Sequence, residues 1–330
     1  MDIKTRFLIL SDTHAGEGIA VPDVAVDVAI HCGDLTEESK LSEFRTSLEL
    51  LKSIKAPLKL VIAGNHDFTL DTPVFQKKVD HALSAFSISP DLLWQEYGRF
   101  GEARQLFAEA ASSNIMLLDE GTHHFKLQNG ARLTVYASPY TPSLAAGWGF
   151  QYRRGDGHNF ALDGADVVIT HGPPRGVLDL TASRQRGGCD QLFAAVARSR
   201  PRLHCFGHIH EGWGSKLVTW RGDRASESPS HFSDIDNAAS TVIESLATLS
   251  PTKWDSPQEA LEKEDRLVAL RKQGYRATSH YYDSEDPLQA PPLMPGRQTL
   301  FVNAAVQSLD EGDGPQLPWV VDIGLPPATG

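Results

Sequence analysis

The chain has 330 residues, of which 41% are hydrophobic and 22% charged, and this composition is typical of a globular protein that buries a full core. Its formal net charge of −11 argues against a protein that binds nucleic acid through the phosphates, because such binding requires clustered Lys and Arg. The three cysteines, Cys32, Cys189 and Cys205, form no Cys-x-x-Cys pair, and no apolar run approaches the roughly 18 residues of a membrane span. We therefore expect a cytoplasmic protein that binds neither nucleic acid stably nor a membrane.

Short apolar runs alternate with longer amphipathic or polar stretches over the first 220 residues, which is typical of a layered α/β domain. The predicted strands are Arg6 to Leu10, Val26 to His31, Lys59 to Ala63, Arg132 to Tyr136, Asp166 to Thr170 and Arg202 to Phe206. Between the second and third strands, apolar residues recur at spacings of three and four, at Leu41, Phe44, Leu48 and Leu51. This spacing predicts a helix with one buried face.

Residues 221–298 are rich in Ser, Asp, Glu and Pro, and we interpret them as a partly helical insertion in a single domain that spans residues 1–330. Ser256, Pro257 and Glu259 form an N-terminal capping box and Gly274 supplies a stop, so a helix is predicted over 257–273. A second helix is predicted over 234–249 from the shared face of Ile235, Val242, Leu246 and Leu249. The tract 287–295 predicts an extended connector, and strand-like sequence returns at 299–303 and 319–323.

Five short segments place polar side chains at or just after the ends of predicted strands: Asp12-Thr-His14, Gly33-Asp34, Gly64-Asn65-His66-Asp67, His171-Gly-Pro-Pro174 and Gly207-His208-Ile-His210. Open α/β sheets build their sites at this position. Imidazole and carboxylate together suit Mn, Fe or Zn better than Ca or Mg, and a carboxylate can bridge two cations. A single Asp or His after a strand is usually a turn or capping residue, but the joint pattern indicates a metal site.

These five segments, in this order, resemble the signature of the calcineurin-like metallophosphoesterase superfamily. The resemblance covers about Phe7 to Trp220 and resumes at about Thr299. Three segments, 170–174, 187–189 and 207–214, are most similar to the metallophosphoesterase-domain-containing subfamily of animals and fungi. The resemblance implies a four-layer α/β/β/α sandwich, in which two sheets pack face to face with helices outside.

The resemblance also implies two divalent metal ions and a role for each motif residue. Asp34 would bridge the two ions, and the remaining ligands would be Asp12, His14 and His210 for the first ion and Asn65, His171 and His208 for the second. His66 would protonate the leaving oxygen, a step worth typically about a hundred- to ten-thousandfold. Asp67 would orient His66 by a hydrogen bond or, as an equal alternative, cap its own backbone turn.

The activity implied is hydrolysis of phosphate esters, foremost phosphodiesters, by a hydroxide that the two metals activate. A phosphomonoesterase or protein phosphatase is the nearest alternative, and a non-catalytic scaffold on the same fold is the second. We expect a small phosphate ester as substrate, while the insertion at 221–298 is a candidate surface for a protein partner. Trp213 is the first candidate for a pocket wall, followed by Phe68, Trp148 and Tyr152, and packing in the core is at least an equal alternative for all four. His31 and His204 are expected to pack beneath the site.

Overall fold

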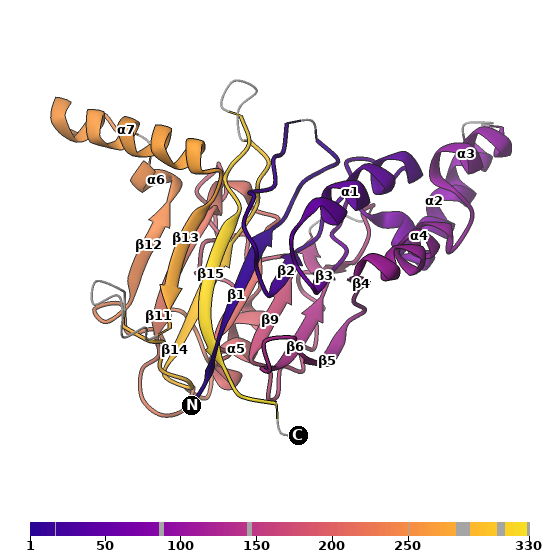
Figure 1. Cartoon of the computed structure of the whole chain (residues 1–330). Helices are drawn as coiled ribbons and strands as arrows, with labels where there is room; N and C mark the ends of the chain where they lie inside the picture. The colour runs from indigo at the N-terminus through magenta and orange to yellow at the C-terminus, as the bar shows by residue number, and fades with distance from the viewer. Residues whose placement is uncertain are drawn as a thin grey trace.

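A computed structural model describes residues 1–16, 18–85, 89–143, 147–249, 251–281, 291–308 and 314–328. Two sheets form the centre of the molecule (Figure 1). In spatial order, the six-stranded sheet contains β13 (Arg276–His280), β15 (Trp319–Leu325), β1 (Ile3–Leu10), β2 (Val28–His31), β3 (Lys59–Val61) and β4 (Ile115–Leu117). The seven-stranded sheet contains β12 (Thr241–Ser245), β11 (Gly214–Thr219), β14 (Gln298–Asn303), β10 (Leu203–Phe206), β9 (Val167–Thr170), β6 (Arg132–Ser138) and β5 (Gly121–Lys126).

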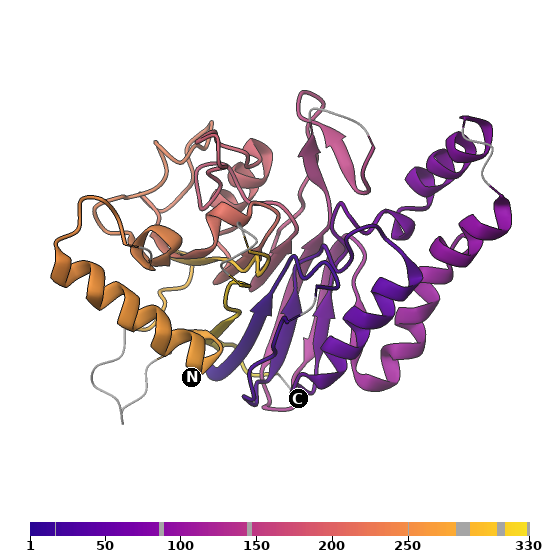
Figure 2. The same ribbon diagram turned by 90° about the horizontal axis from the view of Figure 1, so that it is seen from above.

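Helices cover the outer faces of both sheets (Figure 2). The helices are α1 (Leu41–Ser53), α2 (Thr72–Ala85), α3 (Pro90–Tyr97), α4 (Glu102–Ala110), α5 (Asp190–Ser199), α6 (Leu246–Leu249) and α7 (Pro257–Gln273). A further short pair, β7 (Thr141–Ser143) and β8 (Gln151–Arg153), lies outside the two main sheets. No helix among the residues described is long and apolar enough to cross a bilayer.

Three apolar clusters separate the four layers. Alternate residues of β1, such as Phe7 and Ile9, pack against residues of the opposite sheet such as Ile169, which joins the two sheets face to face. The other residues of β1, such as Leu8, pack outward under helices α1 and α4. On the opposite outer face, α5 packs on β9 and β10. The predicted α/β/β/α sandwich is therefore confirmed.

All six predicted strands form, with ends shifted by a few residues, and the helix predicted from residue 41 is α1. Its four expected apolar residues are all buried. The predicted helix over 257–273 is α7, with both capping-box hydrogen bonds at Ser256 and a left-handed Gly274 after its last turn. Strands β11 and β14 flank the segment 221–298, as expected.

The predicted helix over 234–249 is wrong. Residues 241–245 form strand β12, which pairs antiparallel with β11, and only Leu246–Leu249 are helical. Three consecutive β-branched residues, Thr241, Val242 and Ile243, favour a strand where the edge of a sheet offers hydrogen-bond partners. Part of the predicted connector, residues 287–290, lies outside the described residues.

The segment 221–298 also supplies β13, which pairs parallel with β15 at the edge of the six-stranded sheet. It therefore contributes one edge strand to each sheet. The segment is built into both sheets of the main fold, at the edges opposite β4 and β5.

Candidate metal centre

The five motifs lie in loops that follow the carboxyl ends of parallel strands. β1, β2 and β3 are parallel neighbours in the six-stranded sheet, and β9 and β10 are parallel neighbours in the other. The carboxyl ends of parallel strands meet at one edge, so the loops of each sheet gather their side chains there. The two sets of loops are joined because the Asp12 carboxylate accepts hydrogen bonds from the His208 amide, at 3.0 Å to each oxygen.

One potential metal-ligand group consists of Asp12, His14 and His210, whose ligand atoms all lie within 4.8 Å of one another. The Asp12 Oδ1 atom is 3.3 Å from His210 Nε2. Both ring nitrogens of His14 are buried: Nδ1 has the Glu37 carboxylate at 2.9 Å, in a contact that lacks hydrogen-bond alignment, and Nε2 makes no hydrogen bond with any described residue. A buried imidazole without such partners is costly unless it binds an ion, so this group fits a metal.

The second group consists of Asp34, His171 and His208, again within 4.8 Å. His171 Nδ1 donates to the Cys32 carbonyl at 2.9 Å, which leaves Nε2 facing Asp34 Oδ2 at 3.2 Å. Asn65 Oδ1 joins this group, 3.0 Å from the same Nε2 atom. A backbone carbonyl that fixes one ring nitrogen is a typical support for a metal-binding histidine.

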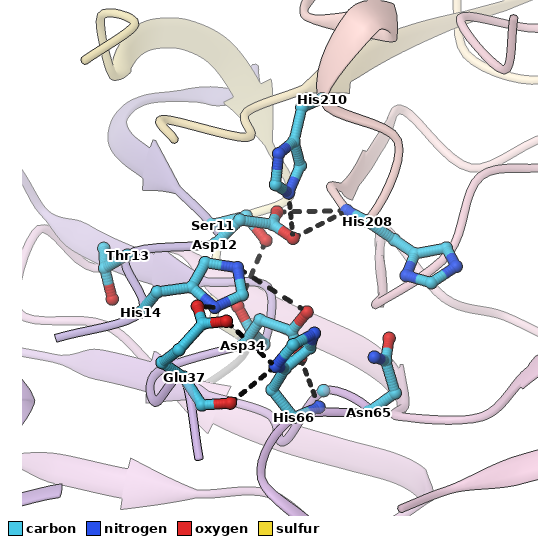
Figure 3. Close-up of polar contacts among 12 residues, drawn as sticks. Ser11, Asp12, Thr13, His14, Asp34, Glu37, Asn65, His66, His208 and His210 are labelled. Atoms are coloured by element: carbon cyan, nitrogen blue, oxygen red, sulfur yellow. Dashed lines mark hydrogen bonds and ion pairs between the residues drawn. The ribbon is translucent and has the colours of Figure 1, made fainter. Parts of the chain in front are cut away.

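Asp34 lies between the two groups (Figure 3). Its Oδ2 atom is 3.2 Å from His171 Nε2 in one group and 3.9 Å from His14 Nε2 in the other. The structure thus brings together all seven residues expected as ligands, with Asp34 in the place that a bridging carboxylate would need.

Strained and tightly packed backbone holds the ligands in these positions. Asp12, His14, Asp34 and His208 all have positive φ angles, between 47° and 67°, a conformation that persists only where the surroundings impose it. Gly64 and Gly207 permit close approach of the loops. A Cβ atom on Gly64 would lie 2.2 Å from Asp34 Oδ1, and one on Gly207 would lie 2.0 Å from Asp12 Oδ2. Larger residues would push both carboxylates out of place.

The electrostatics of the centre favour a cation. Burial raises the pKa of Asp34, but the contact with His171 outweighs it and lowers the pKa of the carboxyl overall. Burial lowers the pKa of His171, but the contact with Asp34 has the larger effect and raises this pKa to about 9. Burial lowers the pKa of His208 to about 4, which keeps this ring neutral. Buried carboxylates beside imidazoles form a donor set that could hold a divalent cation.

His66 and Asp67 are placed differently from each other. His66 stands beside the ligands, with its backbone amide donating to Asp34 Oδ1 at 2.8 Å. The predicted hydrogen bond between Asp67 and the His66 ring is wrong, because the Asp67 carboxylate has other partners. The Asp67 carboxylate accepts from the amides of Gly64, Leu35 and Thr36 and from the Thr36 hydroxyl, at 2.7 to 3.2 Å. Asp67 therefore caps its own turn through the Gly64 amide, as in the alternative expectation, and also binds the loop of Leu35 and Thr36.

Glu37 is a residue of the site that the sequence reasoning missed. Its Oε2 atom lies 2.9 Å from His14 Nδ1, and its backbone carbonyl lies 2.6 Å from His66 Nδ1 (Figure 3). The side chain is half exposed, and its neighbour Glu38 is of the same type. No spacing distinguishes Glu37 from Glu38, so the sequence held no signal for it beyond its place three residues after Asp34.

The aromatic wall of the site is Trp148 rather than Trp213. Trp213 is 1% exposed and packs on Trp319 in the core, where its ring nitrogen donates to the Leu317 carbonyl. Trp148 is 40% exposed, and its ring centroid is 4.2 Å from that of His66. His31 packs beneath the site as expected, with Nε2 2.9 Å from the Thr13 hydroxyl.

The chain is similar to several known proteins. Residues 5–212 match the family described as calcineurin-like phosphoesterase. Metallophosphoesterase domain-containing protein 1 of Homo sapiens and that of Mus musculus are each 38% identical over 221 residues, which is 64% of this chain and 62% of each relative. A probable rhamnogalacturonate lyase C of Emericella nidulans is 34% identical over 223 residues, 66% of this chain but 18% of that protein. The match thus spans less than two thirds of the human and mouse relatives.

Proposed function

Because the chain belongs to the calcineurin-like phosphoesterase family, we propose that it hydrolyses phosphate esters, foremost phosphodiesters, with two divalent metal ions. The observation that carries the proposal is the position of Asp34 between two complete ligand groups, within 3.2 Å of His171 and 3.9 Å of His14. Ions bridged by a carboxylate supply, when bound, an activated water as nucleophile and positive charge for the phosphoryl oxygens.

The residues of the chain divide this work. Asp12, His14 and His210 would hold one ion, and Asn65, His171 and His208 the other, with Asp34 shared. His66 would supply the proton for the leaving oxygen. Its Nδ1 atom faces the Glu37 carbonyl at 2.6 Å, and a carbonyl can only accept, so Nδ1 carries a hydrogen. Nε2, across the ring from Glu37, is therefore the atom that would carry the proton given to the leaving oxygen.

The diester is proposed because the resemblance to the metallophosphoesterase-domain-containing subfamily implies it, while His66 would supply the acid that an alkoxide leaving group requires in either class of ester. Trp148 bounds the space beside His66 with an exposed aromatic face, which suits the organic arm of an ester. The native metals, among Mn, Fe and Zn, are part of the proposal on the grounds of the imidazole and carboxylate ligands.

The test is release of nitrophenol from bis(p-nitrophenyl) phosphate by the purified chain, with added Mn and with a chelator. We expect turnover that the chelator abolishes, and a lower rate on p-nitrophenyl phosphate. A faster rate on the monoester would show that the activity is that of a phosphomonoesterase and would refute the proposed diesterase. Absence of turnover on both esters, in a sample shown to contain two ions per chain, would leave the scaffold alternative.

We also propose that residues 1–330 form one domain and that the segment 221–298 carries a surface for a protein partner. The edge strands β12 and β13 support the first part, because each sheet includes one strand from the segment. Exposed apolar side chains support the second, at Trp254, Leu261 and Val268. In-cell cross-linking that attaches no foreign peptide to α7 would count against a partner on this surface.

A further inference from the structure

Glu37 occupies a place between a metal ligand and the proposed acid. One ligand-type atom from each of Glu37, His14 and His66 lies within 4.8 Å of the others. The Glu37 carboxylate is 2.9 Å from His14 Nδ1 and 4.0 Å from His66 Nδ1. The rings of His14 and His66 are also in contact, with centroids 4.8 Å apart and planes at 86°. A single residue thus touches both rings on the side away from the ligand groups.

Hydrogen bonds to Asp67 fix the loop that carries Glu37. The Asp67 carboxylate accepts from the amides of Leu35 and Thr36 and from the Thr36 hydroxyl, at 3.2, 3.0 and 2.7 Å. Glu37 is the next residue, so its backbone carbonyl is held where it receives His66 Nδ1–H. Its side chain is exposed over about half its surface, yet points back to His14. The contact therefore arises from an anchored backbone.

His14 needs such a partner when it binds a cation. Its Nε2 atom faces the ligand groups, 3.9 Å from Asp34 Oδ2, while Nδ1 faces Glu37. A neutral histidine that binds metal through Nε2 carries its hydrogen on Nδ1, and that hydrogen is commonly given to a carboxylate. Glu37 Oε2 lies 2.9 Å from Nδ1, close enough to receive this hydrogen once the exposed carboxylate turns into line with it.

Resting on the proposed function, we infer that Glu37 is a positioning residue whose carboxylate holds His14 with Nε2 free for the first metal ion, while its carbonyl orients His66. In this role Glu37 would act through the two histidines and bind neither ion directly. His66 cannot join Glu37 and His14 in a third metal site through Nδ1, because this atom donates to the Glu37 carbonyl and has no lone pair for a cation.

The experiment compares Glu37→Ala, Glu37→Gln and the control Glu38→Ala. Glu38 is the adjacent residue, is half exposed and pairs with Lys40 outside the site, so it controls for loss of a loop carboxylate. Binding of Mn to the metal-free chain is measured by calorimetry, and the electron paramagnetic resonance spectrum reports whether two Mn ions are magnetically coupled. Far-ultraviolet circular dichroism verifies that each variant is folded.

In Glu37→Ala we expect one of the two Mn affinities to fall by roughly 10- to 100-fold, the usual effect of removing a partner of a ligand, while the other stays the same. At limiting Mn, the coupled spectrum should give way to that of a single ion. Glu37→Gln should recover most of the affinity, because its amide oxygen still accepts from Nδ1–H. Glu38→Ala should match the parent.

Equal Mn affinities in the parent and in Glu37→Ala would overturn the inference, as would binding of a third ion that Glu37→Ala abolishes. Loss of both affinities together would assign Glu37 a general structural role and also overturn it. Because the readout is metal binding, a parent that binds two ions without ester turnover would refute only the proposed function. A parent that binds no Mn would refute both.

Discussion

The metal centre and the segment 221–298 lie in the same fold but are built in opposite ways. The centre collects residues from five separate loops, buries its carboxylates and holds four ligands in strained backbone. Helix α7, by contrast, is fixed by its own capping box, and its only buried side chain is Leu270. The loops depend on distant parts of the chain for their geometry, whereas the helix depends on its neighbours in sequence. Changes in the first should alter chemistry and metal affinity, and changes in the second only local stability.

The largest effect is expected from Asp34→Asn, which should reduce ester hydrolysis to background. The substitution keeps the shape but removes the charge shared by both ligand groups, so it should exceed the roughly 10- to 100-fold cost of changing a partner of a ligand. Initial rates at saturating Mn measure it. Asp23→Asn is the control, because Asp23 is exposed and pairs only with Lys55 among the described residues. Equal rates for parent and Asp34→Asn would refute a shared carboxylate.

The next effect is that of His66→Asn, and it should depend on the leaving group. An alkoxide requires a proton as it departs, so hydrolysis of an alkyl diester should fall by about 100- to 10,000-fold. Nitrophenolate leaves without one, so bis(p-nitrophenyl) phosphate should be affected far less. His123→Asn, which changes a histidine on β5 that contacts the Asp119 carbonyl, is the control. Equal losses on both substrates would show that His66 does not act as an acid.

Metal binding should stabilise the chain through the centre alone. Mn at about a hundred times its dissociation constant should add about 2.7 kcal/mol to the free energy of unfolding for each independent site. Thermal unfolding with Mn and with a chelator measures the total. Hydrogen exchange by mass spectrometry should show new protection in the loops after β1, β2, β3, β9 and β10. Equal protection of α7 would contradict the separation of the two regions.

Beneath the centre, His204 should make the fold sensitive to acid. Burial lowers its pKa from 6.5 to about 3, and its Nδ1 atom has no hydrogen-bond partner among the described residues. Between these pH values the unfolded chain binds a proton that the folded chain does not. The associated stability is complete above pH 6.5 and is lost as pH falls toward 3, by up to a few kcal/mol.

Denaturant unfolding of the chelated chain at pH 7 and pH 4 measures this effect. His204→Gln should lose less stability over this range than the parent, since glutamine does not titrate and can still pair with the Thr170 hydroxyl that His204 now contacts. The same loss in both proteins would place the acid sensitivity elsewhere.

The smallest effect is expected from Ser256→Ala at the start of α7. Ser256 accepts from the Glu259 amide, and loss of such a cap costs about 1 kcal/mol. Faster hydrogen exchange in the first turn of α7 should reveal it, with unchanged ester hydrolysis. A change in turnover would show that α7 affects the metal centre, and would contradict the view that the two regions are independent.

The sequence predicted those parts of the molecule that depend on local pattern. Six strands, helix α1 and helix α7 follow from apolar spacing and end signals, and the candidate ligands follow from five motifs that resemble a family signature. The prediction failed where two local patterns competed. Apolar side chains have a helical spacing over residues 234–249, but residues 241–245 form β12 because β11 offers an unpaired edge. Local sequence patterns do not show where the fold will leave the edge of a sheet unpaired.

The sequence by itself determined which residues are candidates for the chemistry, because the motifs that resemble the family signature are local patterns. Only the tertiary structure decided how these residues are shared. It placed Asp34 between the two groups, directed Asp67 to the loop of Leu35 and Thr36, and brought Glu37 to His14. It also buried Trp213 and exposed Trp148 beside His66. The physical reason is that a hydrogen bond or a ring contact depends on the group opposite, and the fold brings that group from far along the chain.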